Sequence, residues 1–394
     1  MILKQTPEDF QVEELTSLEP GQGPFCLYRL EKSGWTTPDA LQAIRRRWRL
    51  DQRRLSYGGL KDRHAQTVQY FTVFHGPQRR LTHQGFSVTY LGQVAEPLRS
   101  DHIRANSFQL ILRDVSKEER AIFAQAFEEV RACGVPNYFD DQRFGSVTPE
   151  SLPGEAHFVA KAIILGRHEE ALRLALTAYY PFDRRPQKKE KAILRDHWGN
   201  WAECKDLLPR GHARSLVDYL VGHPEGFRGA LARLRPELRG LYLSAYQSHL
   251  WNRMLAAWLR AHLPADQLVP VPLKLGAVPM HRILGETDLD RLRALQFPLP
   301  SHRTHFEPDD PRRPFFDQVL QEEYLTLDQF KLKGFKEMFF SRGDRAALCL
   351  PGNLKYTPNP DETHPGKQKL RLTFDLPRGS YATLLVKRLF TPAA

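Results

Sequence analysis

Residues 57–69 read Tyr57-Gly-Gly-Leu-Lys-Asp-Arg-His-Ala-Gln-Thr-Val-Gln69 and hold one acid, Asp62, between Lys61 and Arg63. The glycine pair before the acid permits a tight turn or a close approach of the backbone to a ligand. The alternating apolar side chains after the acid predict a half-buried strand over 67–74. Neighbouring cations favour the ionised carboxylate, and an ionised carboxylate can act as a nucleophile. A solvated charged turn is the competing interpretation.

Five further segments of the chain are relevant beside residues 57–69. They are Lys4-Gln-Thr-Pro-Glu-Asp-Phe10-Gln-Val-Glu-Glu14, Asn106-Ser-Phe108, Asn137-Tyr-Phe139-Asp-Asp-Gln-Arg-Phe-Gly145, Ser244-Ala-Tyr-Gln-Ser-His-Leu-Trp-Asn252 and Leu376-Pro-Arg-Gly-Ser-Tyr-Ala-Thr383. Together with GLKDRHAQTVQ, and in this order, they resemble the signature segments of the TruD family of pseudouridine synthases. The resemblance runs from residue 4 to residue 388. Ala105 and Asp140 stand where the family usually has glycine.

The resemblance implies an enzyme that isomerises uridine to pseudouridine in tRNA, at position 13 of the D arm. It also implies that Asp62, the acid of the Lys-Asp pair, is the catalytic nucleophile. Two alternatives stay open. One is the same chemistry at another tRNA position or in another RNA. The other is a catalytically silent RNA-binding protein on the same scaffold.

Pseudouridine formation breaks the C1′–N1 bond of the nucleoside and rejoins the base through C5, after the uridine has left the RNA stack. The sequence contains no Walker A motif, Rossmann fingerprint or metal-spaced His and Cys cluster. We therefore expect no metal and no nucleotide cofactor. A flipped uracil needs aromatic stacking and hydrogen bonds to its polar edge. The motif positions that the resemblance assigns to substrate binding are Phe10, Asn137, Phe139, Tyr381, Lys4 and Lys61.

Each of these positions also has a structural interpretation. The aromatic side chains could belong to the core, and Asn137 could be a turn or cap residue. Glu14 could order Lys4 or be an exposed strand acid, and a structural or phosphate-facing role is expected of His64.

The net charge of +11 favours a polyanionic partner, and with the resemblance we expect that partner to be tRNA. A generically basic soluble protein is the alternative. Arg143 can bind phosphate or pair with an acid of the core. A basic cluster is expected on a proline-containing loop over 183–191, and we expect this cluster to bind RNA. Its cations are Arg184, Arg185, Lys188, Lys189 and Lys191, and a further run joins Arg45, Arg46 and Arg47 to Trp48 and Arg49.

Strand patterns occur at both ends of the chain, and helical patterns dominate its middle. Strands are expected at 10–15, 24–31, 67–74, 87–95, 107–115 and 370–376. Helices are expected from a Thr37 cap with Pro38 in first position, from a Ser116–Glu119 capping box to Arg131, over 157–180, over most of 196–260 and after Gly379. Residues 264–316 are expected to form strands and loops.

These elements predict an α+β protein. Its core is a mixed, largely antiparallel sheet of the pseudouridine synthase type, carrying an inserted α/β domain of the TruD type. The predicted catalytic domain comprises residues 1–150 and 341–394, and the predicted insertion comprises residues 151–340.

The four cysteines, Cys26, Cys133, Cys204 and Cys349, are far apart, which argues against a disulfide scaffold and suits a reducing compartment. No apolar run is long enough to cross a membrane, and the start of the chain lacks the apolar stretch of a signal peptide. We therefore expect a cytoplasmic location without membrane attachment. The sequence leaves the oligomeric state open.

Overall fold

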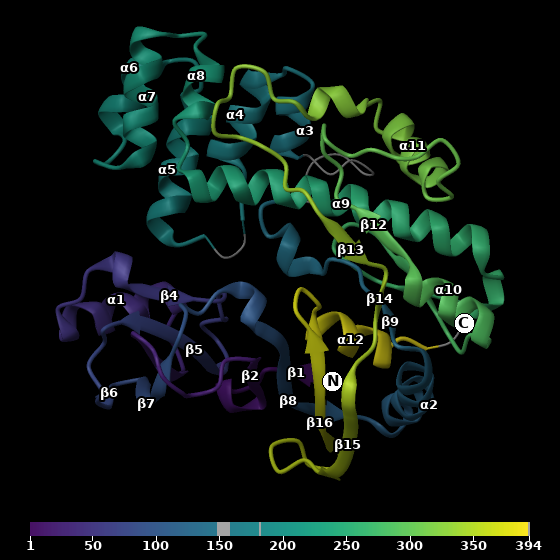
Figure 1. Ribbon diagram of the computed structural model, residues 1–394. Helices are drawn as coiled ribbons and strands as arrows, with labels where there is room; N and C mark the ends of the chain where they lie inside the picture. The colour runs from purple at the N-terminus through teal and green to yellow at the C-terminus, as the bar shows by residue number, and fades with distance from the viewer. Residues whose placement is uncertain (148–157, 181–182, 393–394) are drawn as a thin grey trace. The chain divides into compact units, whose positions relative to one another are not determined.

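The computed structural model describes residues 1–147, 158–180 and 183–392. The chain forms two compact units (Figure 1). Unit 1 comprises Met1–Val135 and Cys349–Ala394, and unit 2 comprises Pro136–Leu348. The short strands β9 (Val135–Pro136) and β14 (Leu348–Cys349) lie where the chain passes from one unit to the other. The assignment of catalytic and inserted domains stays a prediction, and its boundary at residue 150 lies outside the described residues.

Unit 1 is built on one large sheet with strand order β15-β16-β8-β2-β5-β3-β7-β6. Its pairs are antiparallel except for β2 with β5, which run parallel. The shorter strands β1 and β4 extend it beside β8 and β5. The bounds are β1 Ile2–Leu3, β2 Phe10–Thr16, β3 Phe25–Lys32, β4 Leu55–Tyr57, β5 Gln66–Phe74, β6 Leu81–His83, β7 Phe86–Val94, β8 Ile103–Val115, β15 Gly352–Pro360 and β16 Gln368–Pro377.

Three helices cover one face of this sheet: α1 (Thr37–Trp48), α2 (Lys117–Cys133) and α12 (Ala382–Leu389). Alternate strand residues point to this face, because the side-chain period of a strand is two. They form two apolar clusters, one with α2 and α12 and one with α1. Burial of these side chains is the main stabilising contribution to unit 1.

The opposite face of the sheet is polar. Cross-strand pairing aligns Ser107 with Glu13, Glu13 with Val68, Val68 with Glu31 and Glu31 with Ser87. An antiparallel sheet with one packed and one solvated face shows this alternation. The α+β class and the strands predicted at both ends of the chain are confirmed.

Unit 2 is mostly helical, and α9 (Pro236–His262) is the long helix along it in Figure 1. Helix α9 contacts α3, α11 and the strands β11 and β12. The other helices are α3 Val159–Ile164, α4 His168–Thr177, α5 Arg185–Asp196, α6 Trp201–Leu207, α7 His212–Gly222, α8 Phe227–Ala232, α10 Glu286–Ala294 and α11 Arg313–Glu322. Two antiparallel pairs complete the described part: β10 (Leu268–Val271) with β11 (Val278–His281), and β12 (Gln296–Pro298) with β13 (Asp344–Ala346).

Three local predictions were wrong. The expected basic loop over 183–191 is largely helix α5, because Pro186 stands in the first turn, where a proline starts a helix instead of breaking it. The helix expected over 157–180 is divided into α3 and α4 at Gly166, whose φ is +72°. Helix α10 lies inside the region expected to contain only strands and loops.

The cap of α1 is displaced by one residue from the prediction. Thr36 is the N-cap and accepts a hydrogen bond from the Asp39 N–H, whereas Thr37 is the first helical residue. Thr37 is fully buried, and its hydroxyl donates to Gln69 Oε1 at 2.7 Å. The predicted capping box at Ser116 and Glu119 is confirmed.

We expect Gly134→Ala to destabilise unit 1 by about 1–3 kcal/mol. Gly134 ends α2 with φ +71° and ψ −155°, a backbone region that essentially only glycine adopts. A Cβ atom there would lie 2.5 Å from the backbone oxygen of Cys349, which cannot move aside cheaply. Urea denaturation followed by circular dichroism measures the change. Gly21→Ala is the control, because its Cβ would meet nothing within 4 Å. Equal midpoints for the two variants would contradict the strain argument.

Candidate active site

Asp62 lies in the loop that connects β4 to β5, residues 58–65. We name this segment the Asp62 loop. The Asp62 Oδ2 atom accepts a hydrogen bond from the Lys4 ammonium group and forms an ion pair with it. The Oδ1 atom accepts a hydrogen bond from the backbone N–H of His64 at 3.0 Å. The side chain of Asp62 keeps 36% of its surface exposed, so a substrate can reach the carboxylate.

The pKa of Asp62 lies below its ordinary value. Burial is the largest single effect and would by itself raise that pKa. The hydrogen bonds from Lys4 and from the His64 backbone, with the electrostatic effect of the nearby Lys4 ammonium group, outweigh burial. The carboxylate is therefore ionised at neutral pH and available as a nucleophile or a base.

Lys4 is held in an unusual backbone conformation. Its φ is +64°, in the left-handed region that L side chains other than Asn and Asp rarely occupy. Its ammonium group lies 4.1 Å from the centroid of the Phe10 ring, which adds a cation–π contact to the ion pair with Asp62. Phe10 is buried in the core of unit 1 and packs edge-on against Phe108. Strained conformations of this kind concentrate at functional sites.

Lys61, the residue before Asp62, binds a different acid. Its ammonium nitrogen lies 2.6 Å from Glu14 Oε1, and the Glu14 side chain is only 1% exposed. The second carboxylate oxygen of Glu14 accepts a hydrogen bond from the Tyr70 N–H at 3.0 Å. Glu14 was expected to order Lys4 or to be an exposed strand acid. The structure shows that it is buried and anchors Lys61.

The backbone of the Asp62 loop is held by Lys32, which the sequence did not identify, and by Thr37, which the sequence identified only as a helix cap. Lys32 is 2% exposed, and its ammonium group donates to the carbonyl oxygens of Asp62 at 3.1 Å, Trp35 at 2.9 Å and Lys61 at 3.4 Å. Burial lowers the pKa of Lys32 to about 8, against the opposing effect of Asp62. The Thr37 hydroxyl accepts a hydrogen bond from the Lys61 N–H at 2.9 Å. The position of Asp62 is therefore fixed through its neighbours.

Of the two glycines at the start of this loop, only Gly58 is required by close packing. A Cβ atom at Gly58 would lie 2.7 Å from Cγ1 of Ile103, whereas one at Gly59 would meet nothing within 4 Å.

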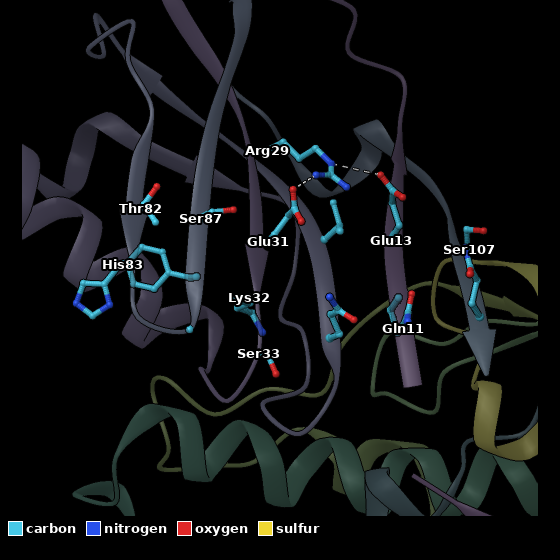
Figure 2. A pocket seen from close by; sticks show the side chains of 16 residues that line it. Gln11, Glu13, Arg29, Glu31, Lys32, Ser33, Thr82, His83, Ser87 and Ser107 are labelled. Atoms are coloured by element: carbon cyan, nitrogen blue, oxygen red, sulfur yellow. Dashed lines mark hydrogen bonds and ion pairs between the residues drawn. The ribbon is translucent and has the colours of Figure 1, made fainter. Parts of the chain in front are cut away.

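A polar hollow of about 480 Å³ lies on the solvated face of the unit 1 sheet (Figure 2). In it, Arg29 forms ion pairs with Glu31 of its own strand, β3, and with Glu13 of β2, which β5 separates from β3 in the sheet. Gln11 and Ser107 also line the hollow and offer hydrogen-bonding groups. We name it the sheet-face pocket. Because Arg29 pairs with both carboxylates and Lys32 also lines the pocket, its surface is of mixed charge and offers both donors and acceptors of hydrogen bonds.

The remaining candidate of unit 1, Tyr381, is the N-cap residue of α12 and is partly buried. Unit 1 therefore contains Lys4, Phe10, Lys61, Asp62 and Tyr381, and the first four meet around the start of β2 and the Asp62 loop.

Asn137 and Phe139 lie in unit 2, where both are 6% exposed. The Asn137 Oδ1 accepts a hydrogen bond from Arg345 Nη2 at 2.9 Å, and its Nδ2 donates to the Ala346 carbonyl. The Phe139 ring packs edge-on against Trp251, and the guanidinium of Arg345 lies 4.0 Å from its centroid. A base could stack on Phe139 only after this ring is uncovered.

The segment 137–145 is joined to α9 by two interactions. Asn252 exchanges hydrogen bonds of 2.8 Å with the backbone N–H and carbonyl of Phe139. Arg143 Nη1 donates to the Ser244 hydroxyl at 3.4 Å, and no ion pair of Arg143 with an acid is found in the described residues. Two motifs of the sequence, more than a hundred residues apart, therefore form one structure within unit 2.

Asp140 fits its position without strain. Its φ of −88° and ψ of 172° are extended values open to any residue, and its side chain is 1% exposed. A glycine is therefore not required here, and the charge of Asp140 is not presented to solvent.

The basic cluster of unit 2 lies at the start of α5. Arg184, Arg185 and Lys189 are exposed. Lys188 donates to the Tyr179 hydroxyl at 3.1 Å, and Lys191 pairs with Asp183 at 2.6 Å. The cluster thus presents three cations without an acidic partner in the described residues.

All four cysteines are buried free thiols. Within the described part of the chain, no helix combines the length and apolar character needed to span a bilayer. In the same residues, no group of three His, Cys, Asp or Glu side chains is arranged to hold a metal ion.

Comparison with known proteins gives consistent matches over the whole length. A profile of the family described as tRNA pseudouridine synthase D (TruD) matches residues 1–389. The chain is 30% identical to the probable tRNA pseudouridine synthase D 1 of Methanococcus maripaludis, over 99% of each protein. It is 28% identical to the tRNA pseudouridine synthase D of Aquifex aeolicus, over 98% of this chain and 97% of that protein.

A crystal structure of the TruD protein from Methanosarcina mazei is similar to this fold. Its TM-score is 0.73 at 28% identity, and the match covers 99% of this chain and 93% of that chain. Because one family profile spans nearly all residues and its relatives align from end to end, the chain belongs to the TruD family of tRNA pseudouridine synthases.

Proposed function

We propose that this enzyme converts uridine 13 in the D arm of tRNA to pseudouridine, with Asp62 as the nucleophile. Membership of the TruD family supports the reaction and the tRNA substrate. The observation that carries the role of Asp62 is its carboxylate, which is ionised by Lys4 and partly exposed, on a loop fixed by buried contacts. The uridine must leave the RNA stack before this carboxylate can reach it.

The chemistry needs one ionised carboxylate at the reacting nucleoside. The C1′–N1 bond breaks, the uracil turns, and a C1′–C5 bond forms. The C5 proton is released, and N1 gains a proton from solvent. Attack by Asp62 on the substrate and elimination across the sugar both require the negative charge that Lys4 and the His64 N–H stabilise.

The other candidate residues have separate parts in this proposal. Lys4 keeps Asp62 ionised, and Phe10 supports Lys4. Because the Lys61 ammonium group is paired with Glu14, Lys61 contributes to substrate binding indirectly, by holding the Asp62 loop in position. The contacts proposed for Asn137, Phe139 and Tyr381 with the uridine, and for Arg143 with the RNA, stay predictions from the motifs.

We expect Asp62→Asn to abolish pseudouridine formation while the affinity for tRNA changes by no more than a few-fold. The amide keeps the shape of the side chain but lacks the charge that a nucleophile needs. Tritium release from tRNA transcripts that contain 5-tritiated uridine measures turnover, and position mapping identifies the target. Asp101→Asn is the control, because Asp101 is 69% exposed and lies outside the Asp62 loop. Turnover of Asp62→Asn within about tenfold of the wild type would exclude Asp62 as nucleophile.

Lys4→Met is expected to slow the reaction at neutral pH and to move the acidic limb of its pH profile to higher pH. The wild-type pKa of Asp62 is depressed, so its carboxylate stays ionised as the pH falls. Without Lys4, the effect of burial remains and raises that pKa, so protonation begins at a higher pH. Lys4→Arg keeps the charge and should restore most of the profile. Single-turnover rates across pH test this, and superimposable profiles of Lys4→Met and the wild type would refute it.

The exposed cations of α5 are expected to contribute to tRNA affinity. Replacing Arg184, Arg185 and Lys189 by Gln should weaken tRNA binding at least about tenfold and reduce its dependence on salt, because each phosphate contact releases a counterion. Replacing Lys331, Lys333 and Lys336 removes the same charge from another exposed part of unit 2. Binding curves at several salt concentrations compare the two variants. Equal losses of tRNA affinity in both would mean that only net charge matters, and would contradict a specific role of the α5 cations.

A further inference from the structure

A second hollow of unit 1, with a volume of about 1080 Å³, lies along the exposed side of α1. We name it the α1 groove. The side chains that matter here are Trp35, Arg46, Arg47, Arg63, His83 and Phe86. Its volume is close to the upper limit for small-molecule pockets, which range over about 300–1,000 Å³. Its size suits a stretch of linked units better than a single small molecule.

The α1 groove is strongly basic. Arg46, Arg47 and Arg63 are exposed, and no ion pair joins them to an acid in the described residues. The one acid that lines the groove, Asp39, already accepts a hydrogen bond from the Thr36 hydroxyl at 2.6 Å. Three arginines around one hollow therefore offer planar groups of donors to an anion from outside.

Three aromatic side chains that line the groove pack against one another. Trp35 packs edge-on against His83 and Phe86, each with its ring centroid 5.2 Å away, and the rings of His83 and Phe86 stack at 4.7 Å. The indole N–H of Trp35 donates to the Gln84 carbonyl at 3.1 Å, which fixes the ring. Basic side chains beside fixed aromatic rings are typical of surfaces that bind single-stranded nucleic acid.

The groove begins next to the proposed nucleophile. Arg63 follows Asp62 in the chain, and its Nε donates to the Gly34 carbonyl at 2.9 Å. The Gly34 N–H returns a hydrogen bond to the Arg63 carbonyl at 3.0 Å. The buried ammonium group of Lys32 donates to carbonyl oxygens of both Asp62 and Trp35. Gly34 and Trp35 of the groove are therefore joined to the Asp62 loop by hydrogen bonds.

The sheet-face pocket and the α1 groove share Thr82, His83 and Phe86 but differ in charge. In the sheet-face pocket, Arg29 pairs with both Glu13 and Glu31, whereas the three arginines of the groove have no acidic partner in the described residues and attract phosphate. A strand that passes Asp62 is thus favoured to turn its phosphates toward α1.

We propose that the α1 groove binds the phosphodiester backbone of the RNA next to the target uridine. This inference rests on the proposed function, because it places the RNA strand at Asp62. Arg46 and Arg47 are positioning residues, which hold the substrate without touching the reacting atoms. Unit 1 then contributes its own part of the RNA-binding surface, independent of the basic cluster on α5.

The test compares two pairs of substitutions on α1 and the turn that follows it. Arg46→Gln with Arg47→Gln removes two groove cations. Arg49→Gln with Arg53→Gln removes the same charge from exposed positions that do not line the groove. Affinity for a fluorescent tRNA transcript is measured between about 50 and 200 mM salt. In addition, kcat and KM are measured by tritium release.

For the groove pair, we expect Kd to rise at least about tenfold and the slope of log Kd against log salt to fall by about 2, as for two lost phosphate contacts. The fall in kcat/KM should come mostly from KM. Arg46→Lys with Arg47→Lys should keep most of the affinity, which separates a role of charge from a role in folding. The control pair should bind like the wild type.

An unchanged Kd and salt slope for the groove pair, or an equal effect of both pairs, would overturn the proposal. Its failure is distinct from failure of the proposed function. If the wild type releases no tritium from any tRNA, the assigned reaction fails, and a selective loss of RNA binding in the groove pair would still support the groove. If the wild type releases tritium and the groove pair binds normally, only the groove is refuted.

Discussion

The buried ion pair between Glu14 and Lys61 is the constraint on which the candidate active site depends. Glu14 lies inside the sheet, where an unpaired carboxylate is strongly unfavourable. Lys61 and the Tyr70 N–H satisfy its two oxygens, so the loop that carries Lys61 must lie against β2. Removing one partner of a buried pair of this kind typically costs about 3–5 kcal/mol, since the other charge is left uncompensated. The position of Asp62 follows from this pairing, because Asp62 is the next residue after Lys61 in the loop.

The adjacent residues Lys61 and Asp62 each belong to a lysine–carboxylate pair, but the two pairs have different roles. The pair of Lys61 and Glu14 is enclosed, so its charges fix structure and are not available for chemistry. The pair of Lys4 and Asp62 is partly open to solvent, so its carboxylate is accessible from outside the protein. The difference arises from burial, because the Glu14 side chain is 1% exposed and the Asp62 side chain is 36% exposed.

Most of the secondary structure of unit 1 could be predicted from the sequence, but only some of the residues of the candidate active site could. Strands such as β5 and β16 were predictable because alternation of apolar residues is a local signal, and the Ser116 cap follows from four consecutive residues. Lys32 was not predicted as a site residue, and Glu14 was not predicted to pair with Lys61, because these partners are distant in sequence and only the folded sheet brings them together. The predicted cap at Thr37 lies one residue from the true cap, Thr36, since the sequence cannot show that Gln69 lies within reach of the Thr37 hydroxyl. The helix α5 was missed because a proline in a first turn and a proline in a loop look alike.

The pairing of β8 with β16 has a consequence for how the polypeptide acquires its structure during synthesis. Strand β8 is made early, but its neighbour β16 leaves the ribosome only after all of unit 2. Until then one edge of β8 has unsatisfied backbone groups, and the apolar side chains that later face α12 lack their cover. Domains generally fold as they emerge, so unit 2 can be complete while the sheet is still open. The nascent chain therefore passes through a long interval with an exposed strand edge, in which protection by chaperones matters more than in a protein whose sheet closes in the order of its sequence.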